Sequence, residues 1–134
     1  MTASEFLALP VRTSEDIVRM RQLVREQSVV LGFGLVDQTK IVTAASELAR
    51  NALIHGGGGE VSVQPLAEGA RRGLKLVFSD QGPGIADVAL ALKDGFTTGG
   101  GLGLGLGGAK RLSNEFAIDS RPGAGTRVTI VRWK

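Results

Sequence analysis

The stretch LKLVFSDQGPG, Leu74 to Gly84, joins an apolar segment to an acidic residue and a Gly-Pro-Gly turn. The apolar segment is rich in β-favouring residues and predicts a buried strand, so Asp80 would lie where that strand ends. Gly82 and Gly84 lack a Cβ and would let a flat ring approach the backbone. Because a carboxylate can accept a hydrogen bond from an exocyclic amine, adenine is the candidate ligand. Taken alone, the stretch also fits a strand that ends in an ordinary turn.

The composition fits one globular domain. The chain has 134 residues, of which 43% are hydrophobic and 22% charged, enough for one core. No apolar run approaches the ~20 residues of a membrane helix, and the N-terminus lacks signal-peptide features, so we expect a cytoplasmic protein without a membrane partner. The absence of Cys excludes disulfides and thiolate metal sites. The net charge of +3 comes from scattered Lys and Arg residues, which argues against nucleic acid as a partner.

Outward from this stretch, the pattern predicts alternating strands and helices. We expect strands at residues 4–11, 60–65, 73–79, 116–120 and 126–133, the second and third forming an antiparallel hairpin. We expect helices at residues 14–31, 36–55, 85–92 and 106–114, the first capped by Thr13 or Ser14. These elements predict a single α+β domain over residues 1–134, a sandwich with a mixed β-sheet covered on one face by helices.

Two polar residues lie four positions apart on the second predicted helix. Glu47 and Asn51 would share one face, while Leu48 and Ala52 face inward. An Asn oxygen there could ligate Mg²⁺, and a Glu could act as a base or orient a water molecule. An isolated pair of this kind also fits a solvated helix surface.

Eight of the 20 glycines of the chain lie between Gly95 and Gly108. The run GGGLGLGLGG, Gly99 to Gly108, would expose backbone N–H groups ahead of a helix, where phosphate is attracted. It lacks the Gly-Lys-Ser/Thr of a P-loop and does not directly follow a strand, which excludes P-loop and Rossmann assignments. Its interleaved leucines are not typical of a linker. We therefore predict a flexible lid over phosphates.

Together these motifs resemble the Bergerat ATP-binding fold of gyrase B, MutL, the heat-shock chaperone ATPases, histidine-kinase catalytic domains and the anti-sigma-factor serine kinases. The N-box, adenine box, lid and late Gly-Thr of that fold are similar to ELARN (47–51), DQGPG (80–84), GLGLGL (101–106) and GT (125–126). Four longer stretches, residues 31–51, 79–85, 94–116 and 122–126, closely resemble the RsbT-like switch serine/threonine kinases of bacterial stressosome pathways.

The resemblance implies ATP and Mg²⁺ as ligands. Asp80 would receive the adenine amine with support from the Thr126 hydroxyl, Asn51 would ligate Mg²⁺, and Glu47 would accept the proton of the phosphoacceptor hydroxyl. The other nucleotide-binding residues that it implies are Gly82, Gly84, Thr97, Thr98, Gly101, Leu102, Gly103, Leu104, Gly105 and Leu106. Arg50 lies beside this face, and contact with the γ-phosphate, contact with a partner and simple solvation all stay open for it.

The resemblance also implies partners. RsbT-like kinases phosphorylate a STAS-domain scaffold protein and, once released, activate a PP2C-type phosphatase. The alternatives are an anti-sigma-factor kinase of the RsbW or SpoIIAB type and a module that binds nucleotide without turning it over. We reject a phosphoacceptor role for His55, because that role needs a separate helical domain and a His at a helix C-terminus favours the helix dipole.

Overall fold

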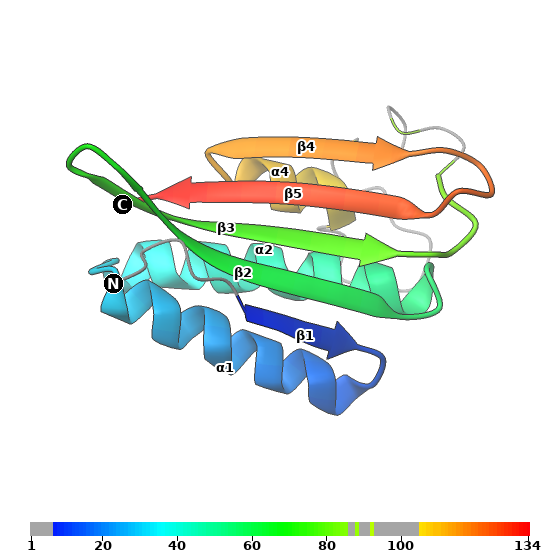
Figure 1. Cartoon of the computed structure of the whole chain (residues 1–134), viewed down its shortest axis with the longest axis horizontal. Helices are drawn as coiled ribbons and strands as arrows, with labels where there is room; N and C mark the ends of the chain where they lie inside the picture. Colours follow the sequence, from blue (N-terminus) through cyan, green and yellow to red (C-terminus); the bar gives the residue numbers. More distant parts are fainter. Residues whose placement is uncertain (1–6, 86–87, 89–91, 93–104) are drawn as a thin grey trace.

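One antiparallel sheet organises the molecule. The computed structural model describes residues 7–85, 88, 92 and 105–134. Its strands are β1 (Leu7–Val11), β2 (Gly59–Glu68), β3 (Arg71–Asp80), β4 (Glu115–Ser120) and β5 (Thr126–Trp133), in the order β1-β2-β3-β5-β4 (Figure 1). The α+β sandwich is confirmed, but the prediction of a mixed sheet was wrong, since all four pairings are antiparallel. Tight turns reverse the chain between β2 and β3 and between β4 and β5, and a helix pair returns it from β1 to β2.

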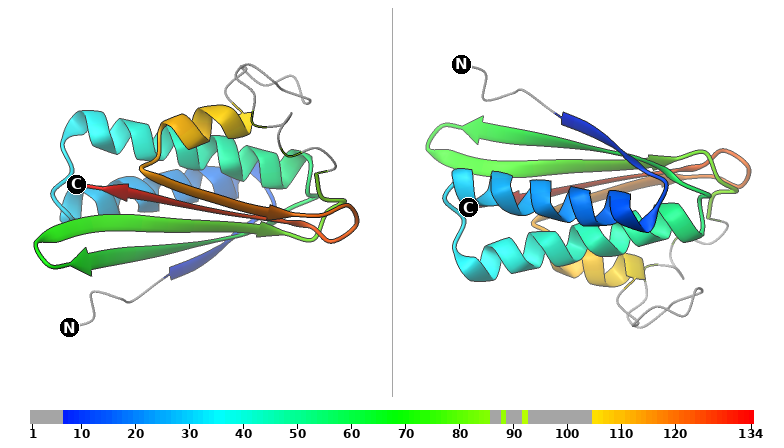
Figure 2. Two further views of the ribbon diagram at one scale, coloured as in Figure 1. Left: turned by 90° about the horizontal axis from the view of Figure 1, so that it is seen from above. Right: turned by 90° about the horizontal axis from the view of Figure 1, so that it is seen from below.

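Three described helices cover one face of the sheet. They are α1 (Ser14–Val30), α2 (Leu35–Ile54) and α4 (Gly105–Arg111), with α2 lying between the other two (Figure 2). Alternate residues of the central strands, such as Leu76, Phe78 and Ile130, meet Ile41 and Leu48 of α2 in the buried core. The helix layer therefore fixes which side of each strand faces inward. No helix in the described part of the chain is long and apolar enough to cross a membrane.

The start of α1 follows the predicted capping. Thr13 is the N-cap, and its Oγ1 accepts a hydrogen bond from the Asp16 N–H (3.1 Å), while Asp16 Oδ2 accepts from the Thr13 N–H (3.2 Å). This reciprocal pair satisfies two N–H groups that the helix itself leaves unbonded. Asp16 also accepts from the Arg12 N–H and pairs with Arg19. These interactions favour the ionised carboxylate, led by the Arg12 bond, and lower the pKa of Asp16 below 3.8.

The hairpin of β2 and β3 is longer than predicted. Residues 68–72 look like a polar turn in the sequence, yet the strands pair as far as Glu68 and Arg71. Tertiary contacts extend them: the Trp133 ring lies against Gly73, and the Arg71 guanidinium lies 3.9 Å from the ring centroid. Of the predicted helix at 85–92, the described residues retain one helical hydrogen bond, from the Leu92 N–H to the Val88 carbonyl (3.0 Å).

Candidate functional site

Asp80 is the last residue of β3, and it faces the helix layer. It is 7% exposed and continues the inward row of Leu76 and Phe78. Its Oδ1 accepts a hydrogen bond from the Gly82 N–H (2.9 Å), which fixes the orientation of the carboxylate at the end of β3. An ionised carboxylate has about four acceptor sites, so acceptor capacity remains for a ligand amine.

Glycines from three loops let the backbone pack closely around Asp80. A Cβ on Gly56 would lie 2.6 Å from Asp80 Oδ2, and a Cβ on Gly125 would overlap the Asp80 carbonyl. A Cβ on Gly82 would run into the Gly56 backbone, and one on Gly84 into the Arg121 carbonyl. The side-chain directions of Gly82 and Gly84 are therefore filled by protein, so these glycines permit close backbone packing where we had predicted space for a ring.

Thr126 begins β5 directly opposite Asp80 in the sheet register and is 7% exposed. Its Oγ1 lies 2.8 Å from Ser120 Oγ. Ser120 Oγ also accepts a hydrogen bond from the Ile85 N–H (2.8 Å) and lies 3.2 Å from the Gly125 carbonyl. One hydroxyl thus ties the turn after Asp80 to the start of β5, and sequence analysis missed Ser120 because no motif marks it.

The polar face of α2 is more buried than a solvated helix surface, which was the alternative explanation for Glu47 and Asn51. The Glu47 side chain is only 10% exposed, and Asn51, one turn later, is half-buried. Arg50 Nη1 lies 3.3 Å from Glu47 Oε2, while the Arg50 side chain is 41% exposed. Simple solvation is therefore not the whole role of Arg50, because its guanidinium pairs with Glu47, the candidate base.

The end of α2 brings these residues toward Asp80. The Gly56 N–H and Gly58 N–H both donate to the Ala52 carbonyl, at 3.1 and 2.9 Å, so the following loop folds back over the last helical turn. Gly56 then lies against Asp80. As a result the last turns of α2, the end of β3 and the start of β5 meet at one end of the sheet (Figure 1).

Two hollows border Asp80 at this end. The larger, about 540 Å³, lies along the loop of residues 56–60 and reaches Arg12. The smaller, about 300 Å³, is lined by Ser120, Arg121 and Thr126 among others. Both are open and polar enough to admit part of a hydrated ligand.

The predicted lid is only partly described. Thr97, Thr98, Gly101, Leu102, Gly103 and Leu104 lie outside the described residues. Gly105 opens α4 with a φ of +52°, and Leu106 is 4% exposed within the core. The side chain of Leu106 is therefore committed to packing, which leaves its backbone N–H as the group that could meet a phosphate. His55 is the C-cap of α2, as expected for a His that favours the helix dipole.

The donor set for a divalent cation on α2 consists of the Asn51 amide oxygen, with Glu47 one turn away. Within residues 7–85, 88, 92 and 105–134, no three His, Cys, Asp or Glu side chains are grouped so that they could hold a metal ion. An amide oxygen is a suitable ligand for Mg²⁺, which commonly completes its shell with phosphate oxygens and water. Asn51 therefore fits a cation that arrives with a nucleotide.

Residues 36–134 match the family of histidine kinase-, DNA gyrase B- and HSP90-like ATPases. The chain belongs to this ATPase family. It is also 47% identical over 123 residues to the serine/threonine-protein kinase RsbT of Bacillus subtilis, covering 92% of both chains. Within the ATPase family it is therefore an RsbT-like serine/threonine-protein kinase.

Two further proteins are more distantly similar to this chain. An anti-sigma F factor of Thermoanaerobacter is 29% identical to this kinase over 99 residues, covering 69% of this chain and 68% of that protein. The solved structure of the RsbU and RsbW domains of a Mycobacterium tuberculosis protein superposes on 98% of this chain and 33% of its own, with a TM-score of 0.64 and 23% identity. At that identity the second likeness supports the fold alone.

Proposed function

We propose that residues 1–134 form one cytoplasmic kinase domain that binds ATP with Mg²⁺ and phosphorylates a serine or threonine on a STAS-domain scaffold. The enclosed Asp80 carboxylate carries this proposal. It lies at a strand end, keeps acceptor capacity for a ligand, pairs with Thr126 in the sheet and packs against Gly56, which follows α2. A buried carboxylate with acceptor sites left over suits the exocyclic amine of adenine, because a buried acceptor is stabilised by each hydrogen bond that it gains.

In the proposed reaction, the chain's own residues position groups and move one proton. Asp80 accepts from the adenine amine, and Thr126 supports the ring. Glu47 takes the proton of the partner's hydroxyl as that oxygen bonds to the γ-phosphorus and the bond to the ADP oxygen breaks. Mg²⁺, ligated by Asn51 and phosphate oxygens, would neutralise charge on the transferred group.

Arg50 assists Glu47 in this scheme. The guanidinium lies 3.3 Å from the carboxylate and can hold it in one orientation on α2. The contact is long for a charge-assisted hydrogen bond, so the carboxylate can still turn toward a hydroxyl. We assign Arg50 to positioning the base.

After phosphorylation the kinase would leave its scaffold and activate a PP2C-type phosphatase. The 47% identity to a kinase named RsbT supports this order of partners over the anti-sigma-factor alternative, for which the identity is 29%. A pull-down with a STAS scaffold, a PP2C phosphatase and a sigma factor as separate baits distinguishes the two. Retention on the sigma factor alone would favour the alternative.

Glu47→Gln tests the assignment of the base. The substitution keeps size and polarity on α2, so Mg-ATP and scaffold binding should persist while phosphate transfer slows by ~10²-fold. The assay follows transfer to a purified STAS scaffold from labelled ATP. Asn51→Ala is the matched comparison, since it should also weaken Mg²⁺-dependent nucleotide binding. Transfer by Glu47→Gln at the wild-type rate would remove Glu47 as base, and wild-type protein that binds ATP but modifies no scaffold would favour the non-catalytic module.

A further inference from the structure

The corner between α1 and α2 exposes apolar side chains. Seven large hydrophobic residues are exposed in the described part of the chain, and four of them flank this one turn. They are Val29 (54%), Val30 (79%), Leu35 (71%) and Val36 (67%), which we call the corner patch. Single exposed apolar residues are common, but a contiguous group on one turn marks an interaction surface.

The corner patch is held rigid. Phe33 is buried at 4% exposure, and its N–H donates to the Ser28 carbonyl (2.9 Å). Gln38 Nε2 donates to the Phe33 carbonyl (2.8 Å), and Arg25 Nη1 lies 3.3 Å from Gln38 Oε1. Because the turn's own bonds fix its backbone, a partner would lose little free energy in ordering it.

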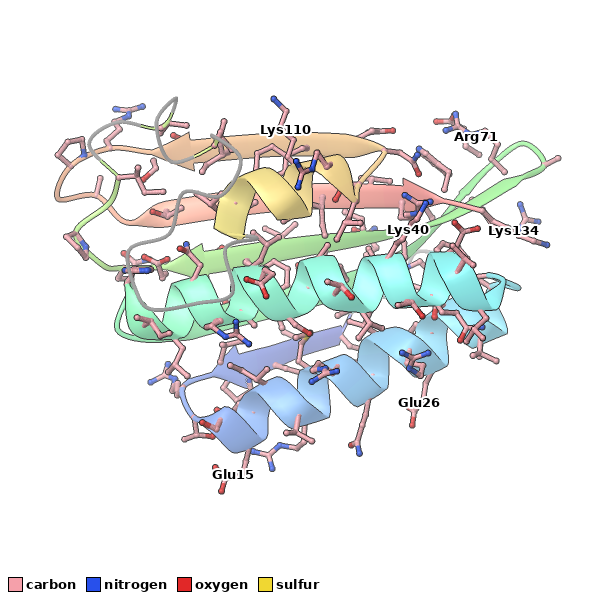
Figure 3. The ribbon with its side chains drawn as sticks, turned by 180° about the vertical axis from the view of Figure 1, so that it is seen from behind. Glu15, Glu26, Lys40, Arg71, Lys110 and Lys134 are labelled. Carbon is pink, nitrogen blue, oxygen red and sulfur yellow. The ribbon has the colours of Figure 1, made fainter. Side chains whose placement is uncertain are left out.

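The charges around the corner patch are mainly positive. Arg25 and Lys40 lie one helical turn from Val29 and Val36, and Lys134 extends over Gly32. Figure 3 shows Lys40, Lys134 and the acidic residue Glu26 toward this end of the molecule. Asp37, the other nearby acid, pairs with Arg132 at 2.7 Å. The rim therefore complements an acidic partner.

The patch is also remote from the nucleotide site. Val36 and Asn51 lie near opposite ends of α2, about 22 Å apart at 1.5 Å per residue. A protein bound at the corner would therefore leave the Asp80 end of the sheet accessible. One helix would then connect a catalytic end and a docking end.

We propose that the corner patch docks an acidic amphipathic helix of a partner protein. The corner offers side chains and no strand edge, so the partner must satisfy its own backbone hydrogen bonds, as a helix does. A second copy of this chain would oppose Lys40 and Lys134 with like charges in a two-fold interface. A membrane surface is disfavoured because the patch has no aromatic anchor, and the one Trp of the chain, Trp133, lies beneath Arg71.

Two synthetic helical peptides test this proposal with the full-length protein. Both carry one leucine stripe, and the flanking positions hold Glu in one peptide and Lys in the other. Fluorescence anisotropy should show the Glu peptide binding at least about tenfold tighter, and added salt should narrow the difference. The double substitution Lys40→Glu and Lys134→Glu should reverse the preference.

A double variant of the patch, Val30→Ser with Leu35→Ser, should weaken the Glu peptide by about tenfold or more. Both side chains are more than two-thirds exposed, so the thermal midpoint and ATP affinity should stay at wild-type values. Val18→Ser is the matched control. Val18 lies on α1 outside the corner patch and is 54% exposed, the same fraction as Val29 within the patch. The control should bind the Glu peptide like wild type.

Four outcomes would overturn the proposal: equal binding of both peptides, no effect of the double variant, a patch-dependent dimer in sedimentation velocity without peptide binding, or patch-dependent binding to anionic phosphatidylserine vesicles without peptide binding. The readouts require neither ATP nor phosphate transfer. Failure of the proposed kinase reaction would therefore leave this test intact, and the reverse also holds.

Discussion

Gly56→Ala should damage the adenine site although Gly56 is not itself a predicted motif residue. Gly56 follows α2 and has no positive φ, so its backbone accepts Ala. The added methyl group would overlap the Asp80 side chain and lie 2.6 Å from Asp80 Oδ2. Because Asp80 is 7% exposed between packed backbones, either its carboxylate rotates away or the loop moves.

The expected loss follows from the hydrogen bonds of Asp80. A rotated carboxylate gives up its bond from the Gly82 N–H and the bond proposed to the adenine amine. A hydrogen bond to a charged acceptor contributes roughly 1.5–3 kcal/mol, so ATP affinity should fall by roughly 10- to 100-fold. The free energy of unfolding should fall by about 1–3 kcal/mol through overpacking.

Isothermal titration calorimetry with ATP, ADP and adenosine measures this loss. All three ligands should weaken by a similar factor, because the damage lies at the base and not at the phosphates. Gly34→Ala is the matched control, since a Cβ there meets nothing within 4 Å and the residue begins the far end of α2. Wild-type affinity in a folded Gly56→Ala protein would refute the placement of adenine at Asp80.

Three further outcomes are expected. Asp80→Asn should lower ATP affinity by about tenfold or more in the same titration, since an amide is a weaker acceptor for the amine. Ser120→Ala leaves the Ile85 N–H and the Thr126 hydroxyl without a partner, so chemical denaturation should show a loss of about 1–3 kcal/mol together with weaker adenosine binding. The stabilisation from Asp16 is complete above pH 3.8 and declines as the pH falls below it, because folding lowers that pKa. The difference in thermal midpoint between wild type and Asp16→Asn should therefore shrink below pH 3.8.

Local chemistry made several elements predictable. The capping pattern at Thr13 and Asp16 specifies the start of α1, because its hydrogen bonds join residues three apart. The apolar run before Asp80 predicts the buried strand, since alternate residues must face one core. The spacing of Glu47 and Asn51 predicts a shared face, because four residues complete about one helical turn.

The sheet pairings and the packing of the site required the tertiary structure. Strand periodicity says which residues face inward but not which strands are neighbours, so the mixed sheet was a wrong prediction. The hairpin ends also extend beyond their apolar residues, because Trp133 and Arg71 pack across them.

The sequence by itself determined where most helices and strands lie and which motif residues, Glu47, Asn51 and Asp80, stand out. Both are recognised from patterns that span only a few neighbouring residues. Only the tertiary structure showed that Gly56 packs on Asp80 and that Ser120 holds the Ile85 turn, 35 residues away in the chain. It also showed that the corner patch is left exposed. These features depend on which distant segments the fold brings together. Contacts that close long loops leave no repeating pattern in the local sequence, so they could not be predicted from it.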